Sequence, residues 1–370
     1  MKDPLPLLRD LIRIPSVNPT GRPGIDHAGE QAVALFLKDL LQGMGATTRL
    51  QSVLPGRPNV IGVFRPEGKI RTRILLAPHT DTVSVAGMTI KPFDPVVKQG
   101  RVWGRGASDT KGPMAAMLTA LGRVTRTAAW RKSGVEFTFA GLMGEEAGND
   151  GAYAWARVCP AYDLALIGEP TEMRVVHAHK GVLWMSLTAL GKARHASLAG
   201  PADNAIYHLL PALNHFHRDM PAFLKKFAHP ALGLPTAQLT MLEAGSKANI
   251  SPQKAVAHAD IRLVPGLNGK IFTAHLRKHI PKNIRIDISS ESLPLDTDPR
   301  HPLVRQLSKD LGGLATAPWF CDAGIFAARG IPSVAVGPGS IRQAHTGDEW
   351  ISLAALRRGT DQLTRALANF

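Results

Sequence analysis

Short apolar segments alternate with amphipathic segments along this 370-residue chain, and that alternation limits its fold more than any other feature. Apolar residues three and four positions apart predict helices at residues 5–14, 30–44 and 110–125. The run Arg73–Ala77 is short, apolar and followed by polar residues, which is typical of a buried parallel strand. Similar runs predict strands at Asn59–Phe64, Val135–Ala140, Asp163–Ile167 and Ser333–Val336. Strands that alternate with helices predict an α/β fold with helices on both faces of a sheet.

The pattern changes after Glu172 and resumes at about Pro302. The intervening segment has predicted strands at residues 181–190, 255–263 and 283–290, and predicted helices at residues 204–223 and 273–280. A β-α-β-β-α-β-like succession inside an α/β chain is typical of an inserted domain. We therefore expect a main domain in two parts, residues 1–175 and 292–370, with a ferredoxin-like α+β domain inserted at residues 176–291.

The cysteine content and the hydropathy exclude several protein classes. Cys159 and Cys321 are too few and too far apart for a disulfide framework, which favours a reducing compartment. The first residues mix Pro, Arg and Asp with apolar residues and do not resemble a secretory signal peptide. No apolar run approaches the roughly 18–20 residues of a membrane-spanning helix. We expect a cytoplasmic protein that does not contact a membrane.

The net charge is the feature that first suggests a nucleic-acid partner. Lys and Arg number 44 against 29 Asp and Glu, which gives a formal charge of +15. Such an excess favours binding to nucleic acid or to other anionic partners. The basic residues are nevertheless scattered, and aromatic residues make up only 6% of the chain. The sequence therefore disfavours a nucleic-acid-binding protein and leaves small anionic substrates as the alternative.

Histidine and acidic residues follow several predicted strands or a glycine-rich turn, at the edge where open α/β sheets bind their ligands. They are His79 and Asp81, Asp109, the pair Glu145 and Glu146, Glu169, and His345. Each alone has a simpler interpretation, since an H-x-D triplet is common in loops and Asp109 could cap the following helix. Taken together, the set contains two histidines and enough carboxylates to supply three more ligands, which matches the ligands of a two-metal hydrolytic site.

Two motifs in this set have specific alternatives. The adjacent carboxylates Glu145 and Glu146 repel each other, and a metal ion would relieve this by binding one and leaving the other as a general base. A solvated acidic loop is the alternative. The Gly-x-Gly before Asp109 resembles a nucleotide-binding loop only weakly, because Ser108 and Asp109 stand where a third glycine is expected.

Five motifs, in this order, resemble the M20 metallopeptidase family. They are His-Thr-Asp, Gly-Arg-Gly-x-x-Asp-x-Lys-Gly, Gly-Glu-Glu, Gly-Glu-Pro and a late Ala-His-x-x-Asp-Glu, and the resemblance covers essentially the whole chain. It implies a mixed-sheet, zinc-exopeptidase-like catalytic domain with an inserted lid that forms a homodimer interface. It also implies two divalent metal ions as cofactors, with Zn²⁺ favoured by the His and carboxylate ligands and Co²⁺ or Mn²⁺ as alternatives.

The resemblance assigns the metal ligands residue by residue. His79, Asp109 and Glu169 would bind one ion, and Glu146, Asp109 and His345 would bind the other. Asp109 would therefore bridge the two ions. The peptide bond after Asp109 is expected to be cis.

Further roles are implied for residues around the metals. Asp81 would orient a histidine ligand, and Glu145 would act as the general base on a water held between the ions. The lid would supply His195 to the partner subunit's site, where it would stabilise the oxyanion. Asn249 and Arg262 would lie near the substrate carboxylate, which suits a guanidinium fork.

The substrate is inferred from shorter matches. The stretches IGEPT, AHKG and GPGSIRQAHTGDE look most like acetylornithine deacetylase, which removes acetate from an N-acetylated basic amino acid in arginine biosynthesis. The stretch WFCDAGIF departs from that pattern, and its Gly324 is a candidate substrate contact. Desuccinylation of a succinylated diamino acid, and carboxypeptidase or dipeptidase activity at the same site, are the alternatives.

Overall fold

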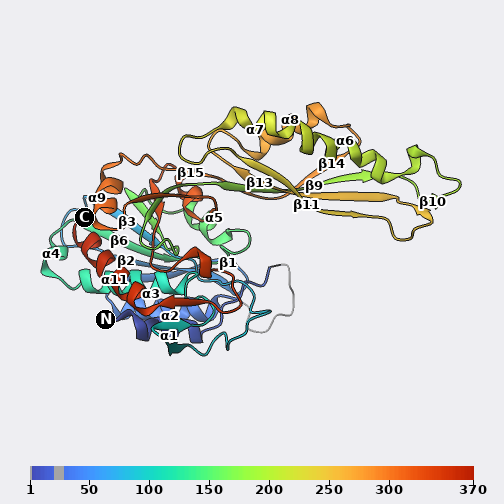
Figure 1. Cartoon of the computed structure of the whole chain (residues 1–370). Helices are drawn as coiled ribbons and strands as arrows, with labels where there is room; N and C mark the ends of the chain where they lie inside the picture. The colour runs from blue at the N-terminus through green and yellow to red at the C-terminus, as the bar shows by residue number, and fades with distance from the viewer. Residues whose placement is uncertain (1, 21–28) are drawn as a thin grey trace. The chain divides into compact units, whose positions relative to one another are not determined.

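The computed structural model describes residues 2–20 and 29–370. This chain separates into two compact units (Figure 1). The first unit comprises the chain up to residue 177 together with residues 297–315 and 321–370. The second comprises residues 178–296 and 316–320. The chain thus leaves the first unit after His177 and returns to it at Thr297, with a short second departure before Cys321.

A mixed sheet forms the centre of the first unit. Its strands include the series β1-β2-β6-β3-β7-β17-β8. Strands β6, β3, β7 and β17 are parallel to one another, whereas β2 pairs with β6 and β8 pairs with β17 in the antiparallel sense. The bounds are β1 (Thr47–Leu54), β2 (Arg57–Phe64), β3 (Thr72–Ala77), β6 (Val135–Gly141), β7 (Leu164–Ile167), β8 (Val175–His179) and β17 (Ser333–Ala335). Strands β6 and β7 are buried along their whole length, as expected of parallel strands covered on both faces. The mixed sheet with its helices confirms the predicted α/β fold.

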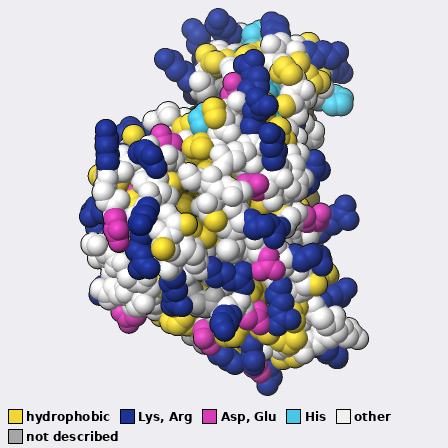
Figure 2. Space-filling model, turned by 90° about the vertical axis from the view of Figure 1, so that its left-hand side faces the viewer, with side chains coloured by type: hydrophobic (Ala, Val, Ile, Leu, Met, Phe, Trp, Pro, Cys, Tyr) yellow, Lys and Arg dark blue, Asp and Glu magenta, His cyan; other side chains and the backbone are white. Residues whose placement is uncertain are grey.

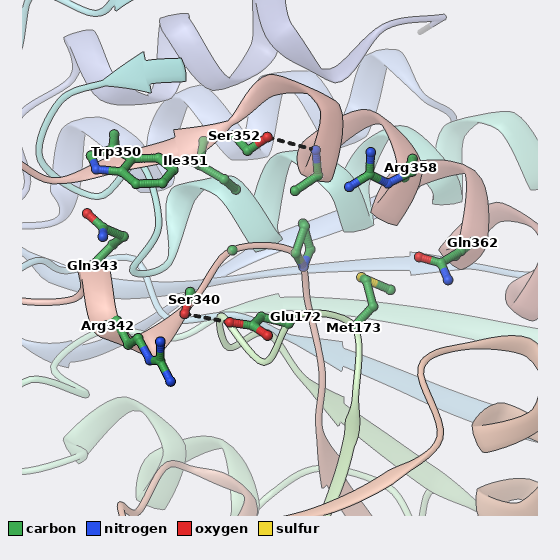
Figure 3. Close-up of a pocket in the computed structure, with 13 residues that line it drawn as sticks. Glu172, Met173, Ser340, Arg342, Gln343, Trp350, Ile351, Ser352, Arg358 and Gln362 are labelled. Carbon is green, nitrogen blue, oxygen red and sulfur yellow. Dashed lines mark hydrogen bonds between the residues drawn. The ribbon is translucent and has the colours of Figure 1, made fainter. Parts of the chain in front are cut away.

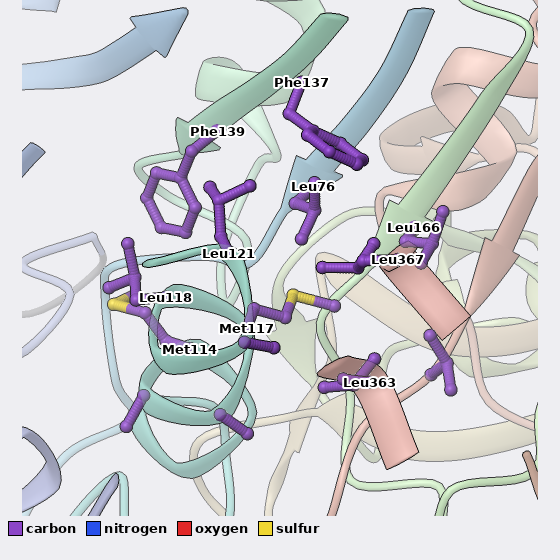
Figure 4. Close-up of a cluster of buried hydrophobic side chains, with 14 of the residues drawn as sticks. Leu76, Met114, Met117, Leu118, Leu121, Phe137, Phe139, Leu166, Leu363 and Leu367 are labelled. Carbon is purple, nitrogen blue, oxygen red and sulfur yellow. The ribbon is translucent and has the colours of Figure 1, made fainter. Parts of the chain in front are cut away.

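Helix α3 (Lys111–Val124) packs against this sheet and against the C-terminal helix α11 (Leu353–Ala368). Figure 4 shows Met117 of α3 facing Leu363 and Leu367 of α11, and Leu121 of α3 close to Leu76 of β3. Almost every residue of α3 is buried, because this helix has apolar neighbours on all sides. Since α3 begins two residues after Asp109, the same packing fixes the loop that carries this candidate ligand.

The other elements of the first unit are shorter or lie at its surface. The helices are α1 (Pro4–Arg13), α2 (Gln31–Gly43), α4 (Ala128–Arg131), α5 (Asp150–Ala156), α9 (Pro302–Asp310) and α10 (Ala323–Ala327). A separate small sheet has the order β18-β5-β4, with β4 (Val96–Lys98), β5 (Arg101–Trp103) and β18 (Trp350–Ser352), and β16 (Leu314–Ala317) pairs with β8. The predicted helices α1, α2 and α3 are confirmed. The exposed strands β1 and β4 have no buried apolar run and were not predicted.

The second unit is an antiparallel sheet with helices on one face (Figure 1). The strand order is β11-β13-β9-β14, and every neighbouring pair is antiparallel. The strands are β9 (Gly181–Leu190), β11 (Thr236–Ala244), β13 (Lys254–Leu263) and β14 (Arg285–Ser292). The short strands β10 (Arg194–His195) and β12 (Ile250–Ser251) pair with each other, and β15 (Leu295–Asp296) pairs with β8. The helices are α6 (Ala205–Arg218), α7 (Met220–Leu224) and α8 (Gly269–His279). The order β9-α6-β11-β13-α8-β14 is a β-α-β-β-α-β arrangement, although the exposed strand β11 was not predicted.

On the face shown in Figure 2, the basic residues are not gathered in one place. Figure 2 shows Lys and Arg side chains spread over the whole visible face, with Asp and Glu side chains between them. This distribution agrees with the scattered basic residues of the sequence. Among the described helices, none combines the length and the apolar character needed to cross a membrane.

Candidate metal centre

Three neighbouring strands place candidate ligands at one edge of the sheet. His79 follows β3, Glu146 follows β6 and Glu169 follows β7. Because β6, β3 and β7 are parallel neighbours, the polar residues after them meet at the same end of the sheet. Asp109 reaches this end from the loop before α3, and His345 from the loop before β18.

Asp109 lies at the centre of the cluster. His79 Nε2 is 3.1 Å from Asp109 Oδ1, and His345 Nε2 is 3.5 Å from Asp109 Oδ2. His345 Nε2 also lies 3.0 Å from Glu146 Oε2. One carboxylate oxygen of Asp109 thus faces each histidine, an arrangement that suits a carboxylate shared by two ions. The bond between Asp109 and Thr110 is cis, which confirms that expectation.

The donor set of this cluster fits divalent metal ions. Ligand atoms of His79, Asp109 and Glu146 lie within 4.8 Å of one another. Within the described chain, Oε1 of Glu146 and Oε1 of Glu169 are buried and have no hydrogen-bond partner. Buried carboxylate oxygens without a donor are costly, and a cation is the partner that would satisfy several of them at once.

The pKa values of the residues in this cluster also fit the binding of divalent metal ions. Burial raises the pKa of Glu146 to about 7, and the charge of Asp109 acts in the same direction. Burial and Asp109 also raise the pKa of Glu169 well above its usual value. Hydrogen bonds to Asp109 and Glu146 raise the pKa of His345 to about 10. The raised pKa values indicate that the surrounding protein does not fully compensate the negative charge of this cluster, and divalent ions would provide that compensation.

Asp81 connects the loops that carry the candidate ligands. His79 Nδ1 lies 3.0 Å from the Asp81 carbonyl oxygen and 3.3 Å from its carboxylate, which leaves Nε2 as the ligand atom. The Asp81 carboxylate also accepts the backbone N–H groups of Glu145 and Glu146, each at 3.0 Å. Asn18 Nδ2 donates to it at 2.7 Å. The sequence did not identify Asn18, which is far from every motif.

Glu349 holds the loop that carries Asp109, and the sequence did not identify it. Its Oε1 accepts the N–H groups of Ser108 and Asp109 at 2.8 and 2.9 Å. Its Oε2 accepts the N–H of Gly106 at 2.9 Å and Arg105 Nη1 at 2.8 Å. These four bonds satisfy a fully buried carboxylate. The Asp-Glu that closes the last motif was the only sequence signal for this contact.

Glu145 differs from its neighbour Glu146 in its surroundings. Its backbone is fixed by Asp81, and its side chain is partly exposed. Burial by the surrounding chain raises the pKa of Glu145 well above its usual value; His79 opposes this, and Glu169 and Glu146 add to it. A carboxyl group held near the cluster with a raised pKa is suited to exchange protons with a reacting group.

The candidate substrate residues His195, Asn249 and Arg262 all belong to the second unit. His195 is exposed in β10, and the N–H of Ala196 donates to the Asn249 carbonyl at 2.9 Å, so His195 and Asn249 lie in adjacent segments. Arg262 of β13 donates to Asp260 through Nε at 2.9 Å and Nη2 at 3.0 Å. Part of its guanidinium fork is therefore occupied by a neighbour on the same strand.

The segment around Gly324 is buried in the first unit. Gly324 lies in α10, and the preceding Asp322 accepts Asn149 Nδ2 at 2.9 Å. Cys321 is also buried, and burial raises the pKa of its thiol well above the usual value. A protonated, buried thiol is a poor nucleophile.

A pocket of about 550 Å³ also opens in the first unit, and none of the candidate metal ligands lines it (Figure 3). It lies between the segment around Glu172, the loop around Ser340 and the start of α11. Ser340 Oγ donates to Glu172 at 2.7 Å, and Arg342 and Arg358 also line the pocket. The pocket is therefore distinct from the strand-end cluster.

A family model and several solved structures match the chain. The model for peptidase family M20/M25/M40 matches residues 75–369. An M20 family metallo-carboxypeptidase from Sulfolobus solfataricus is 20% identical with a TM-score of 0.80, covering 100% of this chain and 99% of its own. A tripeptidase from Staphylococcus aureus is 19% identical with a TM-score of 0.78, covering 99% and 97%. A dinuclear metal binding peptidase of the M20 family from Bacillus subtilis is 13% identical with a TM-score of 0.69, covering 99% and 97%.

At these identities the structures establish a shared fold, and the family model establishes the relationship. It covers the segments that carry His79, Asp109, Glu146, Glu169 and His345. The chain therefore belongs to peptidase family M20/M25/M40 and is a metal-dependent hydrolase of that family.

Proposed function

We propose that this protein is a dinuclear metal-dependent amidohydrolase that removes the acyl group from an N-acyl amino acid. The observation that carries the proposal is the position of Asp109, with one oxygen toward His79 and the other toward His345. Glu169 would share one ion with His79 and Asp109, and Glu146 would share the other ion with His345 and Asp109. The unpartnered oxygens of Glu146 and Glu169 support this assignment.

The residues around the two proposed ions have different roles. When bound, two divalent ions supply Lewis-acid polarisation of the amide carbonyl and lower the pKa of a water molecule. His79, Asp109 and Glu169 would hold one ion, and Glu146, Asp109 and His345 would hold the other. Asp81 keeps His79 in the tautomer with the proton on Nδ1. Zn²⁺ is the ion that this His and carboxylate set favours, with Co²⁺ or Mn²⁺ as alternatives.

Glu145 moves the proton in this mechanism. Its carboxylate accepts a proton from the attacking water while the water oxygen forms a bond to the carbonyl carbon. Glu145 then gives the proton to the amine nitrogen as the carbon–nitrogen bond breaks, so that a carboxylic acid and an amine leave. Burial raises the pKa of Glu145, which makes its carboxylate a stronger base toward water than an exposed glutamate.

The substrate carboxylate is the group that the second unit would recognise. Arg262 and Asn249 are proposed to bind it, with Arg262 using the Nη1 group that its bonds to Asp260 leave free for this contact. His195 is proposed to stabilise the oxyanion from the partner subunit, and its exposed ring is available for such a role. Gly324 is proposed to line the substrate site.

A homodimer through the second unit is part of the same proposal. The strand β11 is at an edge of the sheet, and its Met241 and Leu242 are 55% and 60% exposed. Trp184 of β9 is also exposed. An open sheet edge with large exposed apolar side chains favours association with a second copy. Sedimentation velocity of the wild type and of a Leu242→Lys variant tests this, because the charge should shift a dimer to a monomer.

Measuring kcat/KM for three substrates with the metal-loaded protein identifies the preferred substrate. We expect hydrolysis of acetylornithine to exceed that of succinyl-diaminopimelate and of a dipeptide in kcat/KM. Hydrolysis of the dipeptide alone would contradict the deacylase assignment and leave the metal centre intact.

Carboxypeptidase or dipeptidase activity is the second candidate. It is favoured by the similar structures, which include a metallo-carboxypeptidase and a tripeptidase. Both reactions break an amide bond beside a free carboxylate, so the same ligands and Glu145 serve either one. The deacylase and peptidase activities differ in the acyl group that the substrate site accepts.

A further inference from the structure

Three histidines of the second unit converge on one point between two helices. His215 lies in the last turn of α6, and His275 and His279 lie one turn apart in α8. Ring nitrogens of the three lie within 4.8 Å of one another. His215 Nε2 is 3.0 Å from His275 Nε2, and the ring centres of His275 and His279 are 4.2 Å apart. The cluster is separate from the strand-end residues of the first unit.

The second ring nitrogen of two of these histidines is already bound. His215 Nδ1 lies 3.2 Å from the Asp219 carboxylate, and an ionised carboxylate can only accept, so this nitrogen carries the proton. His279 Nδ1 lies 2.8 Å from the His275 carbonyl oxygen, which fixes the proton there as well. Nε2 of both residues is therefore the nitrogen with the lone pair. A carboxylate or carbonyl partner on the other nitrogen is the arrangement that metal-binding histidines use.

The surroundings hold His275 in place and favour the neutral form of His275 and His215. The ring of Phe223 is stacked on His275, with ring centres 3.7 Å apart and planes at 10°. Burial lowers the pKa of His275 to about 4, and the neighbouring His279, His215 and Lys226 add to this, while Asp219 opposes it. Burial also lowers the pKa of His215. Neutral imidazole is the form that binds a metal ion.

We propose that His215, His275 and His279 bind one divalent transition-metal ion of the Zn²⁺ class and so join α6 to α8. Two nitrogens on one tetrahedral zinc are about 3.3 Å apart, given Zn–N distances of about 2.0–2.1 Å. The 3.0 Å between His215 Nε2 and His275 Nε2 is close to this value. Three imidazole nitrogens suit zinc, nickel or copper rather than magnesium or calcium. His279 is exposed, so the ion has access from solvent.

A metal-free interpretation also accounts for part of this geometry. His275 could donate from Nε2 to His215 Nε2, and the three rings could stack without an ion. That interpretation gives His279 no function beyond stacking. It predicts that a metal ion has no effect on this unit.

The number of zinc ions bound per full chain distinguishes the metal-bound interpretation from the metal-free one. The protein is stripped with a chelator, dialysed against Zn²⁺ alone, and its bound metal is measured by mass spectrometry. We expect the His275→Asn and His279→Asn variants each to hold one zinc fewer per chain than the wild type. His217→Asn, an exposed histidine of the same helix α6, is the matched control and should hold as many as the wild type.

Two further variants make the result independent of folding and of the catalytic centre. Asp219→Asn keeps all three ligands, and removal of such a partner weakens metal affinity about 10- to 100-fold. In an Asp109→Ala background, the zinc held by the histidine cluster should remain. Equal zinc content in the wild type, His275→Asn and His279→Asn would overturn the proposal, whatever the activity of the strand-end centre. If His275→Asn does not fold, His279→Asn at its exposed position decides the question.

Discussion

The two units of this molecule differ in whether they bury Asp, Glu, Lys and Arg side chains. In the first unit, many charged side chains are buried: Glu30, Arg57, Asp81, Arg105, Asp109, Lys111, Glu136, Glu169, Asp322 and Glu349. In the second unit, none of the described Asp, Glu, Lys or Arg side chains is buried, and its core is a cluster of apolar residues. The first unit thus accepts an electrostatic cost that the second avoids.

The electrostatic cost of burying charges in the first unit is concentrated around the candidate metal centre. Buried charges are retained only where hydrogen bonds, opposite charges or cations compensate them. Glu349 is compensated by three N–H groups and Arg105, and Glu30 by Arg57. In the ligand cluster, by contrast, one carboxylate oxygen of Glu146 and one of Glu169 have no hydrogen-bond partner. The difference between the units therefore predicts that metal removal and charge removal affect the first unit far more than the second.

Metal removal should have the largest effect. Chelation of the full chain should abolish amide hydrolysis, and added Zn²⁺ or Co²⁺ should restore it, because the ligand cluster needs cations for the reaction. Asp109→Ala should abolish hydrolysis without restoration, since this residue faces both histidines. Activity is measured with acetylornithine, and metal content in parallel. Full activity in the chelated protein would contradict the dinuclear centre.

Loss of the proton carrier should have the next largest effect. Glu145→Gln should lower kcat by about 10²- to 10⁴-fold, the usual contribution of a general base. Metal content should remain that of the wild type, because Glu146 and not Glu145 is the proposed ligand. Asp150→Asn removes an exposed carboxylate nearby and is the matched control, with near-normal kcat expected. A similar kcat for Glu145→Gln and Asp150→Asn would rule out this role.

The strand-end cluster shows how much of the site follows from sequence. The apolar runs before His79, Glu146 and Glu169 predict neighbouring strands, and parallel strands bring their ends together, so local pattern is sufficient there. The contacts of Asn18 with Asp81, and of Glu349 with the Asp109 loop, join segments 63 and about 240 residues apart. Such contacts depend on how loops pack, and local pattern does not contain that information.

The second unit shows a related limit. The spacing of His275 and His279 places them on one face of a helix, but His215 is 60 residues away in the sequence and joins them only because α6 packs beside α8. Strand β11 was not predicted because most of its residues are exposed, so it lacks the alternation that identifies β13. Sequence pattern thus predicts elements with a buried face and misses those whose position is set by their neighbours.

A stability measurement compares the units directly. Arg57 donates to Glu30 through Nε at 2.7 Å and Nη2 at 2.6 Å, and both side chains are buried. Arg57→Met should lower the free energy of unfolding by about 3–5 kcal/mol, because it leaves Glu30 buried without its partner. In the second unit, Arg285 pairs with Asp287 at 2.7 Å in an exposed position, and Arg285→Ala should cost about 0–1 kcal/mol.

Urea titrations in the presence of a chelator measure both values without a contribution from bound metal. The double variant Glu30→Leu with Arg57→Met should recover part of the loss, since it removes the unpaired charge. Equal losses for Arg57→Met and Arg285→Ala would show that burial does not distinguish the two units.

An exposed ion pair in the first unit tests what causes the difference in stability loss. The cause could be the burial of the charges or their location in the first unit. Asp3 accepts Arg357 Nη2 at 2.7 Å, and its side chain is 39% exposed. The hydrogen bond to Arg357 lowers the pKa of Asp3, against a smaller opposing effect of burial. Asp3→Asn removes the charge but keeps an N-cap residue before α1, so it isolates the ion pair.

The sign of the pH dependence follows from that lowered pKa. A carboxylate whose pKa is lower in the folded state stabilises the fold above its unfolded pKa of about 3.9, and this contribution is lost as the pH falls through the folded pKa. Asp3→Asn should therefore reduce stability near neutral pH by roughly a tenth to a fifth of the Arg57→Met loss, with the difference disappearing in acid and shrinking at high salt. Urea titrations of both chains from neutral to acidic pH provide the measurement. A loss as large as that of Arg57→Met would mean that charges in the first unit matter irrespective of their burial, and the contrast between the units would then need another cause.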